Sequence, residues 1–214
     1  MPDDDLHPSP VTWHDHAKVD EYLGRVGGLK YRLAGEEALL EFLPAAPRRV
    51  ADLGCGDGRL AALVLEHRPD IDEVVAVDRS APMLAKARER FANDDRVRVT
   101  EHDLDEDLTP LGEFDIVVSG FAIHHLHDDR KRTLVAEIAR QLRPAGVFAN
   151  LEVIESATPE LRSAFYTAIG REHGDPEDRL VDIETQLGWM RAAGLQQVDC
   201  VWRWRGFALL VGNA

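Results

Sequence analysis

The sequence predicts a single α/β domain in which helices cover both faces of a mostly parallel sheet. Short apolar runs at 50–53, 74–77 and 114–118 alternate along the chain with longer segments of helical periodicity. Parallel strands buried on both faces are typically continuous apolar runs, and their alternation with helices indicates crossover units. A glycine-rich turn at 54–58 follows the first run and precedes a helix, which predicts a ligand site at that edge of the sheet.

Composition and charge narrow the function classes. The 214 residues suffice for one sizeable domain, with 44% hydrophobic and 30% charged residues, as in an ordinary globular protein. The formal charge of −14 disfavours a nucleic-acid partner, which would require a basic face. No apolar run approaches the roughly 18 residues of a membrane span, so we expect no membrane association. A monomer and a homodimer both remain open.

The termini and cysteines indicate a cytoplasmic protein. The first residues lack the basic flank and apolar core of a signal peptide. Cys55 and Cys200 do not form a disulfide framework pattern. Residues 1–43 are expected to form an N-terminal tail and a helical lid, with helices at about 15–24 and 30–43 separated by Gly27-Gly28.

The turn Asp52-Leu53-Gly54-Cys55-Gly56-Asp57-Gly58 favours one nucleotide-type ligand over another. A dinucleotide-binding turn has glycines at positions one, three and six, whereas here they stand at one, three and five and the sixth position is Arg59. The Asp52 carboxylate would repel a pyrophosphate but suits a ligand with an amino group and a positive charge. These features favour S-adenosylmethionine over NAD.

This stretch resembles the first motif of the class I S-adenosylmethionine-dependent methyltransferases, of the small-molecule type. Ser80-Ala81-Pro82-Met83-Leu84 and the Leu142–Phe148 turn also resemble the family pattern, and the resemblance covers roughly residues 48–155. It implies a Rossmann-like three-layer sandwich with a seven-stranded, mostly parallel sheet whose last strand is antiparallel. It also implies S-adenosyl-L-methionine as cofactor, S-adenosyl-L-homocysteine as product and one domain over residues 1–214.

Several residues are predicted to bind the cofactor. Asp78 ends the second strand, 20 residues after Gly58, where a carboxylate can accept hydrogen bonds from ribose hydroxyls. The alternative role for Asp78, a helix cap, suits Ser80 better. The resemblance places Met83 against adenine, Asp103 at the adenine amino group and the Leu104 backbone N–H at the ring. Asp105, Glu106 and Asp107 are interpreted as solvated surface. The full set of cofactor candidates is Tyr22, Asp52, Gly54, Cys55, Gly56, Asp78, Arg79, Met83, Asp103, Leu104 and Ser119.

Histidines follow the fourth strand, where the resemblance places the methionine end of the cofactor and the acceptor. His124 and His125 are candidate catalytic residues, because imidazole titrates in the range needed to deprotonate an amine or hydroxyl acceptor. A carboxylate acceptor needs no base, only an orienting cation. The alternative roles are a helix cap and a buried histidine with a backbone partner. Glu152 is the third catalytic candidate, or the partner of an arginine. Together His124, His127 and Glu152 do not have a recognised ligand spacing, so no metal is predicted.

Substrate choice is expected to depend on a helical cap insert over 156–195, with helices at about 159–170 and 182–193, since such inserts commonly carry specificity. Strands at about 198–204 and 207–211 are expected to close the sheet as a hairpin. The substrate-binding candidates are His14, Arg32, His127, Arg162, Tyr166 and Gln186.

The predicted function is in-line methyl transfer to a small-molecule acceptor through oxygen, nitrogen or a carboxylate. Two alternatives stay open: a non-catalytic S-adenosylmethionine-binding regulatory protein, and an NAD-dependent oxidoreductase.

Overall fold

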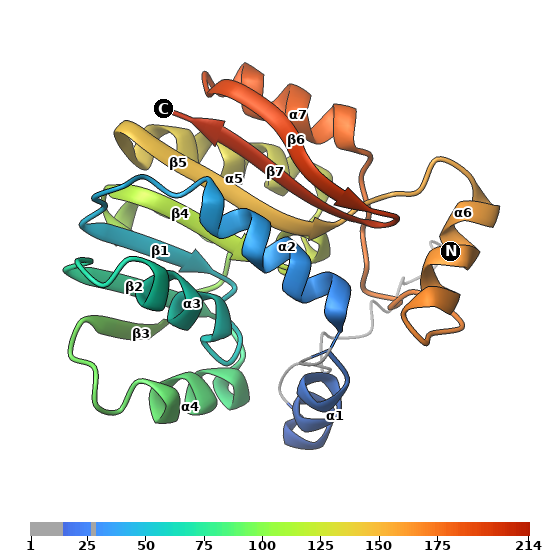
Figure 1. Cartoon of the computed structure of the whole chain (residues 1–214), viewed down its shortest axis with the longest axis horizontal. Coiled ribbons are helices and arrows are strands. Elements are labelled where there is room, and N and C mark those ends of the chain that lie inside the picture. Colours follow the sequence, from blue (N-terminus) through green and yellow to red (C-terminus); the bar gives the residue numbers. More distant parts are fainter. Residues whose placement is uncertain (1–14, 27–28) are drawn as a thin grey trace, which may run out of the picture.

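The fold is organised around a seven-stranded sheet of order β3-β2-β1-β4-β5-β7-β6 (Figure 1). The computed structural model describes residues 15–26 and 29–214. The strands are β1 (Arg49–Leu53), β2 (Glu73–Asp78), β3 (Val97–Glu101), β4 (Phe114–Gly120), β5 (Leu142–Val153), β6 (Gln196–Trp204) and β7 (Phe207–Asn213). Strands β1 to β5 pair in parallel, and β7 runs antiparallel to both of its neighbours, β5 and β6. The predicted Rossmann-like sheet with an antiparallel last strand is confirmed.

Helices cover both faces of this sheet (Figure 1). They are α1 (His16–Val26), α2 (Lys30–Glu41), α3 (Arg59–His67), α4 (Ala81–Arg90), α5 (Asp128–Gln141), α6 (Pro159–Ala168) and α7 (Ile183–Ala192). Helices α2 and α3 pack on one face, and α5 and α7 pack on the other. The strand order reverses between β1 and β4, so their carboxyl ends diverge there into a crevice suited to a ligand.

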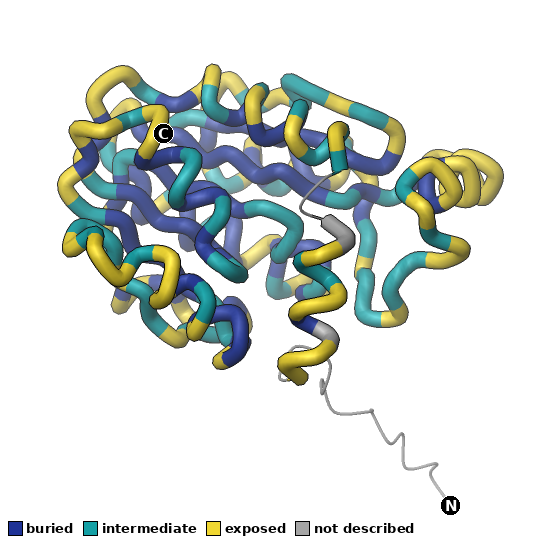
Figure 2. The backbone as a smooth tube through the Cα atoms, turned by 60° about the horizontal axis from the view of Figure 1, so that its bottom comes forward, coloured by how far each residue is buried: buried dark blue, intermediate teal, exposed yellow. Residues whose placement is uncertain are grey.

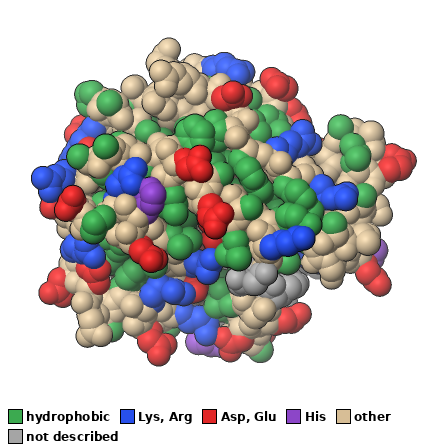
Figure 3. Space-filling view, in the orientation of Figure 1, with side chains coloured by type: hydrophobic (Ala, Val, Ile, Leu, Met, Phe, Trp, Pro, Cys, Tyr) green, Lys and Arg blue, Asp and Glu red, His purple; other side chains and the backbone are tan. Residues whose placement is uncertain are grey.

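The core follows from the two-residue period of the strands. On β1, Val50 packs with α2 and α3, while Ala51 and Leu53 pack with the α5 side. Figure 2 shows the buried sheet running through the centre of the molecule, whereas α6 is mostly exposed. On the face drawn in Figure 3, basic side chains are interspersed with acidic ones. Among the described residues, no helix is long and apolar enough to cross a bilayer.

The expected two-helix cap over 156–195 needs a correction. Helix α7 packs on the sheet beside α5, because Leu187 and Met190 lie on one helical face and are buried in the main core. This helix is therefore part of the sandwich. Only α6 and its flanking loops project from the body (Figure 1), held by Phe165 against Phe207 and Trp204.

The turn between β1 and α3 needs three left-handed residues. Gly54, Gly56 and Gly58 have φ values of +69°, +55° and +79°, a region that costs other residues roughly 1–2 kcal/mol each. A Cβ on Gly54 would lie 2.2 Å from the Cβ of Ala122, and one on Gly58 would lie 2.5 Å from the Phe91 ring. The turn can therefore be built only with glycine at these two positions.

We expect Gly58→Ala to lower the free energy of unfolding by about 1–3 kcal/mol, because it combines a left-handed backbone with a ring contact. Thermal unfolding should show a decrease of roughly 2–10 °C. The matched control is Gly188→Ala, since Gly188 lies in α7 and a Cβ added there would meet nothing within 4 Å. Alanine in a helix is favoured there by up to about 1 kcal/mol. Equal melting temperatures for the two variants would contradict the strain argument.

Candidate active site

A cleft opens at the carboxyl ends of β1, β2 and β4 and encloses about 890 Å³ of space, open solvent at its mouth included. Eleven of the predicted site residues line it: Tyr22, Arg32, Gly54, Cys55, Gly56, Asp78, Arg79, Met83, Asp103, Leu104 and His125. They come from α1, α2, the glycine turn, the end of β2 with the loop after it, α4, and the segments that follow β3 and β4. The structure thus brings most of the predicted cofactor residues to one place.

The glycine turn forms one wall of this cleft with bare backbone. The Cys55 N–H donates to the Val77 carbonyl at 2.8 Å, which fixes the turn against β2. At Gly56 the nearest atom to an added Cβ would be the Met83 sulfur at 3.7 Å. The peptide at Gly56 is therefore only lightly packed on this side, and a ligand can lie directly against it.

Asp78 is held in place by the turn that it faces. Its Oδ2 accepts from the Gly56 N–H at 2.9 Å, and its Oδ1 accepts from the Ser80 N–H at 2.8 Å. Burial raises the pKa of this carboxyl, although the two N–H donors oppose that effect. Each carboxylate oxygen has a further lone pair for a hydroxyl in the cleft. Ser80 caps α4 by accepting from Met83 N, as predicted.

The far side of the cleft is a loop after β3. Arg79 lies 3.8 Å from Asp103 in an ion pair, and the Leu104 carbonyl accepts from Arg130 at 2.6 Å, which anchors the loop to α5. Asp105 also lines the cleft. The interpretation of Asp105 as solvated surface only is therefore corrected, because a charge run by itself does not tell which of its members turns inward.

Asp52 is buried with half of its carboxylate unsatisfied. Its Oδ2 accepts from the Ala61 N–H at 3.0 Å, whereas Oδ1 has no hydrogen-bond partner among the described residues. Burial raises the pKa of Asp52 to about 7. Asp52 lines a smaller compartment, of about 290 Å³, that shares Arg32 and Gly54 with the main cleft. A cationic donor reaching this compartment would satisfy Oδ1.

Ser119 does not contact the cleft through its side chain. It is fully buried on β4 opposite Leu53 of β1, and its Oγ donates to the Leu53 carbonyl at 2.8 Å. The hydroxyl therefore ties two neighbouring strands together. The prediction that the Ser119 side chain binds the cofactor is therefore corrected. The position of a residue at a strand end does not reveal which way its side chain points.

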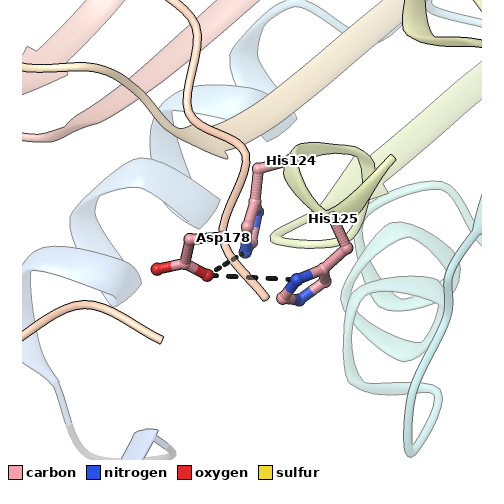
Figure 4. Close-up of side chains that lie close together, drawn as sticks. All are labelled: His124, His125 and Asp178. Atoms are coloured by element: carbon pink, nitrogen blue, oxygen red, sulfur yellow. Dashed lines mark ion pairs between the residues drawn. The ribbon is translucent and has the colours of Figure 1, made fainter. Parts of the chain in front are cut away.

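His124 and Glu152 form a buried pair behind the cleft wall. The His124 ring donates from Nδ1 to Glu152, the His124 backbone N–H donates to the same carboxylate at 2.9 Å, and Nε2 lies 3.4 Å from Asp178 (Figure 4). Burial alone would lower the pKa of His124, but the carboxylates of Glu152 and Asp178 outweigh it and raise this pKa to about 9. Neither His124 nor Glu152 lines the cleft. The prediction that His124 and Glu152 act directly in catalysis is therefore corrected. Both side chains instead hold neighbouring groups in place.

His125 is the predicted catalytic residue that does reach the cleft. Its ring centroid lies 4.0 Å from that of His124, and its Nδ1 lies 3.9 Å from Asp178 Oδ1 (Figure 4). Burial, followed by the charge on His124, lowers the pKa of His125 well below its ordinary value. The ring is therefore neutral at physiological pH and a poor proton acceptor.

Asp178 is a site residue that sequence reasoning does not find. It lies in the loop between α6 and α7, among other acidic residues and without any motif. The backbone hydrogen bond from Arg179 N to the His124 carbonyl, at 3.0 Å, attaches this loop to the histidine turn. Phe121, Ala122 and Leu126 also line the cleft. Their only sequence signal is their place after the fourth strand.

The substrate-binding candidates divide into three groups. Arg32 lines the cleft, is paired with Glu36 at 2.9 Å, and lies 5.2 Å from the centroid of the Phe121 ring. His14 lies outside the described residues. The other candidates do not line the cleft.

Each of these others has a structural position instead. His127 is exposed at the start of α5, and Arg162 is ion-paired with Glu155 on the projecting α6. Tyr166 is buried beneath the loop at Gly174, and Gln186 donates from Nε2 to the Val181 carbonyl at 2.9 Å. These four assignments are corrected, because their side chains are used in local packing and hydrogen bonds or face solvent away from the cleft.

Comparison with known proteins supports the methyltransferase family that the sequence motifs predict. Residues 50–146 match the family model described as a methyltransferase domain. The chain belongs to the class I S-adenosylmethionine-dependent methyltransferases.

Three similar proteins illustrate the relationship. An uncharacterized methyltransferase of Mycobacterium bovis is 37% identical over 131 residues, which cover 61% of this chain and 62% of that protein. A malonyl-[acyl-carrier protein] O-methyltransferase of Salmonella typhimurium is 33% identical over 160 residues, covering 72% of this chain and 58% of that one. The structure of an O-methyltransferase family protein from Burkholderia thailandensis superimposes with a TM-score of 0.73 and 22% identity, over 94% of this chain and 60% of that chain. The chain thus spans about three fifths of the length of these proteins.

We expect Asp52→Asn to stabilise the cofactor-free protein increasingly as pH rises. Because the pKa of Asp52 is raised from 3.8 to about 7 in the folded state, the stability that comes from its protonated form is complete below about pH 3.8 and is lost as pH rises through 7. Above that pH the wild type carries a buried, half-satisfied charge that asparagine lacks. The difference in melting temperature between variant and wild type should therefore grow between about pH 4 and pH 7 and level off above that. A pH-independent difference would contradict this assignment.

Proposed function

We propose that this protein transfers a methyl group from S-adenosylmethionine to a small-molecule acceptor. The observation that carries the proposal is the open glycine turn with the Asp78 carboxylate hydrogen-bonded beside it in the cleft. The unsatisfied Oδ1 of buried Asp52 fits the same cofactor, since the missing donor is what an ammonium group offers. When bound, S-adenosylmethionine supplies an electrophilic methyl group on a sulfonium sulfur.

In this proposal the chain's own residues bind and orient. Asp78 accepts hydrogen bonds from ribose hydroxyls with the lone pairs that Gly56 and Ser80 leave free. Met83 and Leu104 enclose the base, and Asp103 accepts from its amino group. Asp52 interacts with the amino end through the smaller compartment. Such positioning lowers the barrier chiefly by removing the entropy cost of bringing two reactants together.

The acceptor end of the proposed site is the wall formed by Arg32, Phe121 and His125. Because the lowered pKa of His125 makes it a poor base, acceptors that arrive already deprotonated suit this wall best. A carboxylate is such an acceptor, and the guanidinium of Arg32 beside the Phe121 ring is a suitable orienting cation. The Salmonella relative is named as an O-methyltransferase, which is consistent with an oxygen acceptor. We therefore propose a small carboxylate, with a hydroxyl as the second choice.

We expect Asp78→Ala to weaken binding of S-adenosylhomocysteine more than tenfold by calorimetry, because hydrogen bonds to a charged group contribute about 1.5–3 kcal/mol. The matched control is Ser119→Ala. Ser119 is also hydrogen-bonded at the end of a central strand and is fully buried, but it does not line the cleft, so the affinity should stay at the wild-type value. Loss of affinity in both variants would point to general destabilisation instead.

We expect the full chain to form S-adenosylhomocysteine fastest with small carboxylic acids in a panel that also includes alcohols, phenols and amines. The readout is S-adenosylhomocysteine release over the acceptor-free rate. Faster turnover with amines would overturn the carboxylate assignment while leaving methyl transfer intact. Tight cofactor binding without turnover on any acceptor would favour the regulatory alternative.

A further inference from the structure

Three potential ligand atoms converge beside the cleft in a cluster of which the proposed methyl transfer uses only His125, as part of the acceptor wall. They are His124 Nε2, His125 Nδ1 and Asp178 Oδ1, here called the His-His-Asp cluster, and all lie within 4.8 Å of one another (Figure 4). The carboxylate oxygen lies 3.4 Å from the first nitrogen and 3.9 Å from the second. Donor atoms around a tetrahedral zinc ion, at about 2.0–2.1 Å from the metal, are separated by about 3.4 Å. One edge of the cluster already has this length, and the other two, of 3.9 Å and at most 4.8 Å, would shorten when an ion binds.

Hydrogen bonds fix the side chains of His124 and Asp178, as hydrogen bonds to ligand residues do at metal sites. The Nδ1 of His124 donates to Glu152, so its Nε2 is directed at Asp178. A carboxylate behind a histidine ligand is the usual arrangement at metal centres, because it fixes the ring and increases its basicity. Asp178 is likewise fixed, since its Oδ2 accepts from the Asp175 N–H at 3.0 Å and leaves Oδ1 facing both rings.

The charge balance also favours a cation. Glu152 and Asp178 are two carboxylates with side chains only 1% and 10% exposed. Within residues 15–26 and 29–214, neither forms an ion pair with a lysine or arginine. Buried carboxylates require a positive partner close by. The His124 ring, which contacts both carboxylates, carries the one positive charge that the structure describes beside them. A divalent ion among the three ligand atoms would replace its Nε2 proton and supply a second positive charge.

We propose that the His-His-Asp cluster binds a divalent transition-metal ion, with zinc as the first choice. Two imidazoles and one carboxylate are a ligand set of catalytic zinc sites and of related first-row metals, and three protein ligands leave a coordination position open. The His124 ring ligates through Nε2 and keeps its Nδ1 hydrogen bond to Glu152. His125 also lines the cleft, so the ion lies at the cleft wall, where its open position is suited to an anionic oxygen. This site departs from the prediction of no metal, because Asp178 is 53 residues away from His125 and has no motif.

The test measures metal binding alone, without cofactor or acceptor, so it succeeds or fails independently of the proposed methyl transfer. Untagged full-length protein is stripped with a chelator and titrated with Zn²⁺ by calorimetry and with Co²⁺ by absorption spectroscopy. We expect one ion per chain and the visible bands of low-symmetry Co²⁺ with nitrogen and oxygen ligands. His125→Ala and Asp178→Asn should each weaken the affinity at least about 100-fold, and Glu152→Gln about 10–100-fold.

The matched control is His127→Ala, which removes an exposed histidine two positions from His125 and should bind as tightly as the wild type. Thermal unfolding checks that each variant is folded. Absence of Co²⁺ bands and of Zn²⁺ heat in the wild type overturns the proposal without any variant. Unchanged affinity in both His125→Ala and Asp178→Asn also overturns it, because the ion would then lie at another of the chain's nine histidines.

Discussion

The whole site depends on a backbone that turns through three left-handed glycines at the end of β1. The turn brings the β1 and α3 ends together, contacts β2 through the Cys55 N–H and leaves the Gly56 peptide bare toward the cleft. Asp78 is oriented by that same peptide, so the turn positions both its own surface and the acid opposite it. Any side chain at Gly54 or Gly58 would collide with a neighbouring element. One local steric constraint therefore determines where the ligand site can be.

A second constraint is electrostatic and acts on the opposite wall. Burying carboxylates costs several kcal/mol each unless cations and hydrogen bonds compensate. Glu152 and Asp178 are compensated through His124, whose ring joins the end of β5 to the loop before α7. The same contact holds His125 beside the cleft and keeps it neutral. The wall is thus rigid and poor in bases, which suits alignment of an acceptor better than removal of its proton.

Buried charge also explains how helix α2 is attached to the glycine turn and α3. Glu36 is almost fully buried and accepts from Arg32 on its own helix and from Arg59 at the start of α3. A charged pair that is bidentate and half-buried constrains geometry more strongly than an exposed one. Arg32 is held in this way where the main cleft and the Asp52 compartment meet. Helix α2 and the start of α3, which follows the glycine turn, are therefore coupled through one carboxylate.

The sequence by itself determined the order and type of the elements, the glycine turn and the place of Asp78, because these follow from local periodicity, backbone sterics and the position of strand ends. Only the tertiary structure decided which side chains at those ends face the ligand. Ser119 points to β1 because strand register sets its side, and α7 belongs to the sandwich because its apolar face meets α5. Asp178 joins the histidines across more than fifty residues through a loop hydrogen bond. Such contacts depend on how distant segments pack, and no local pattern in the chain records them.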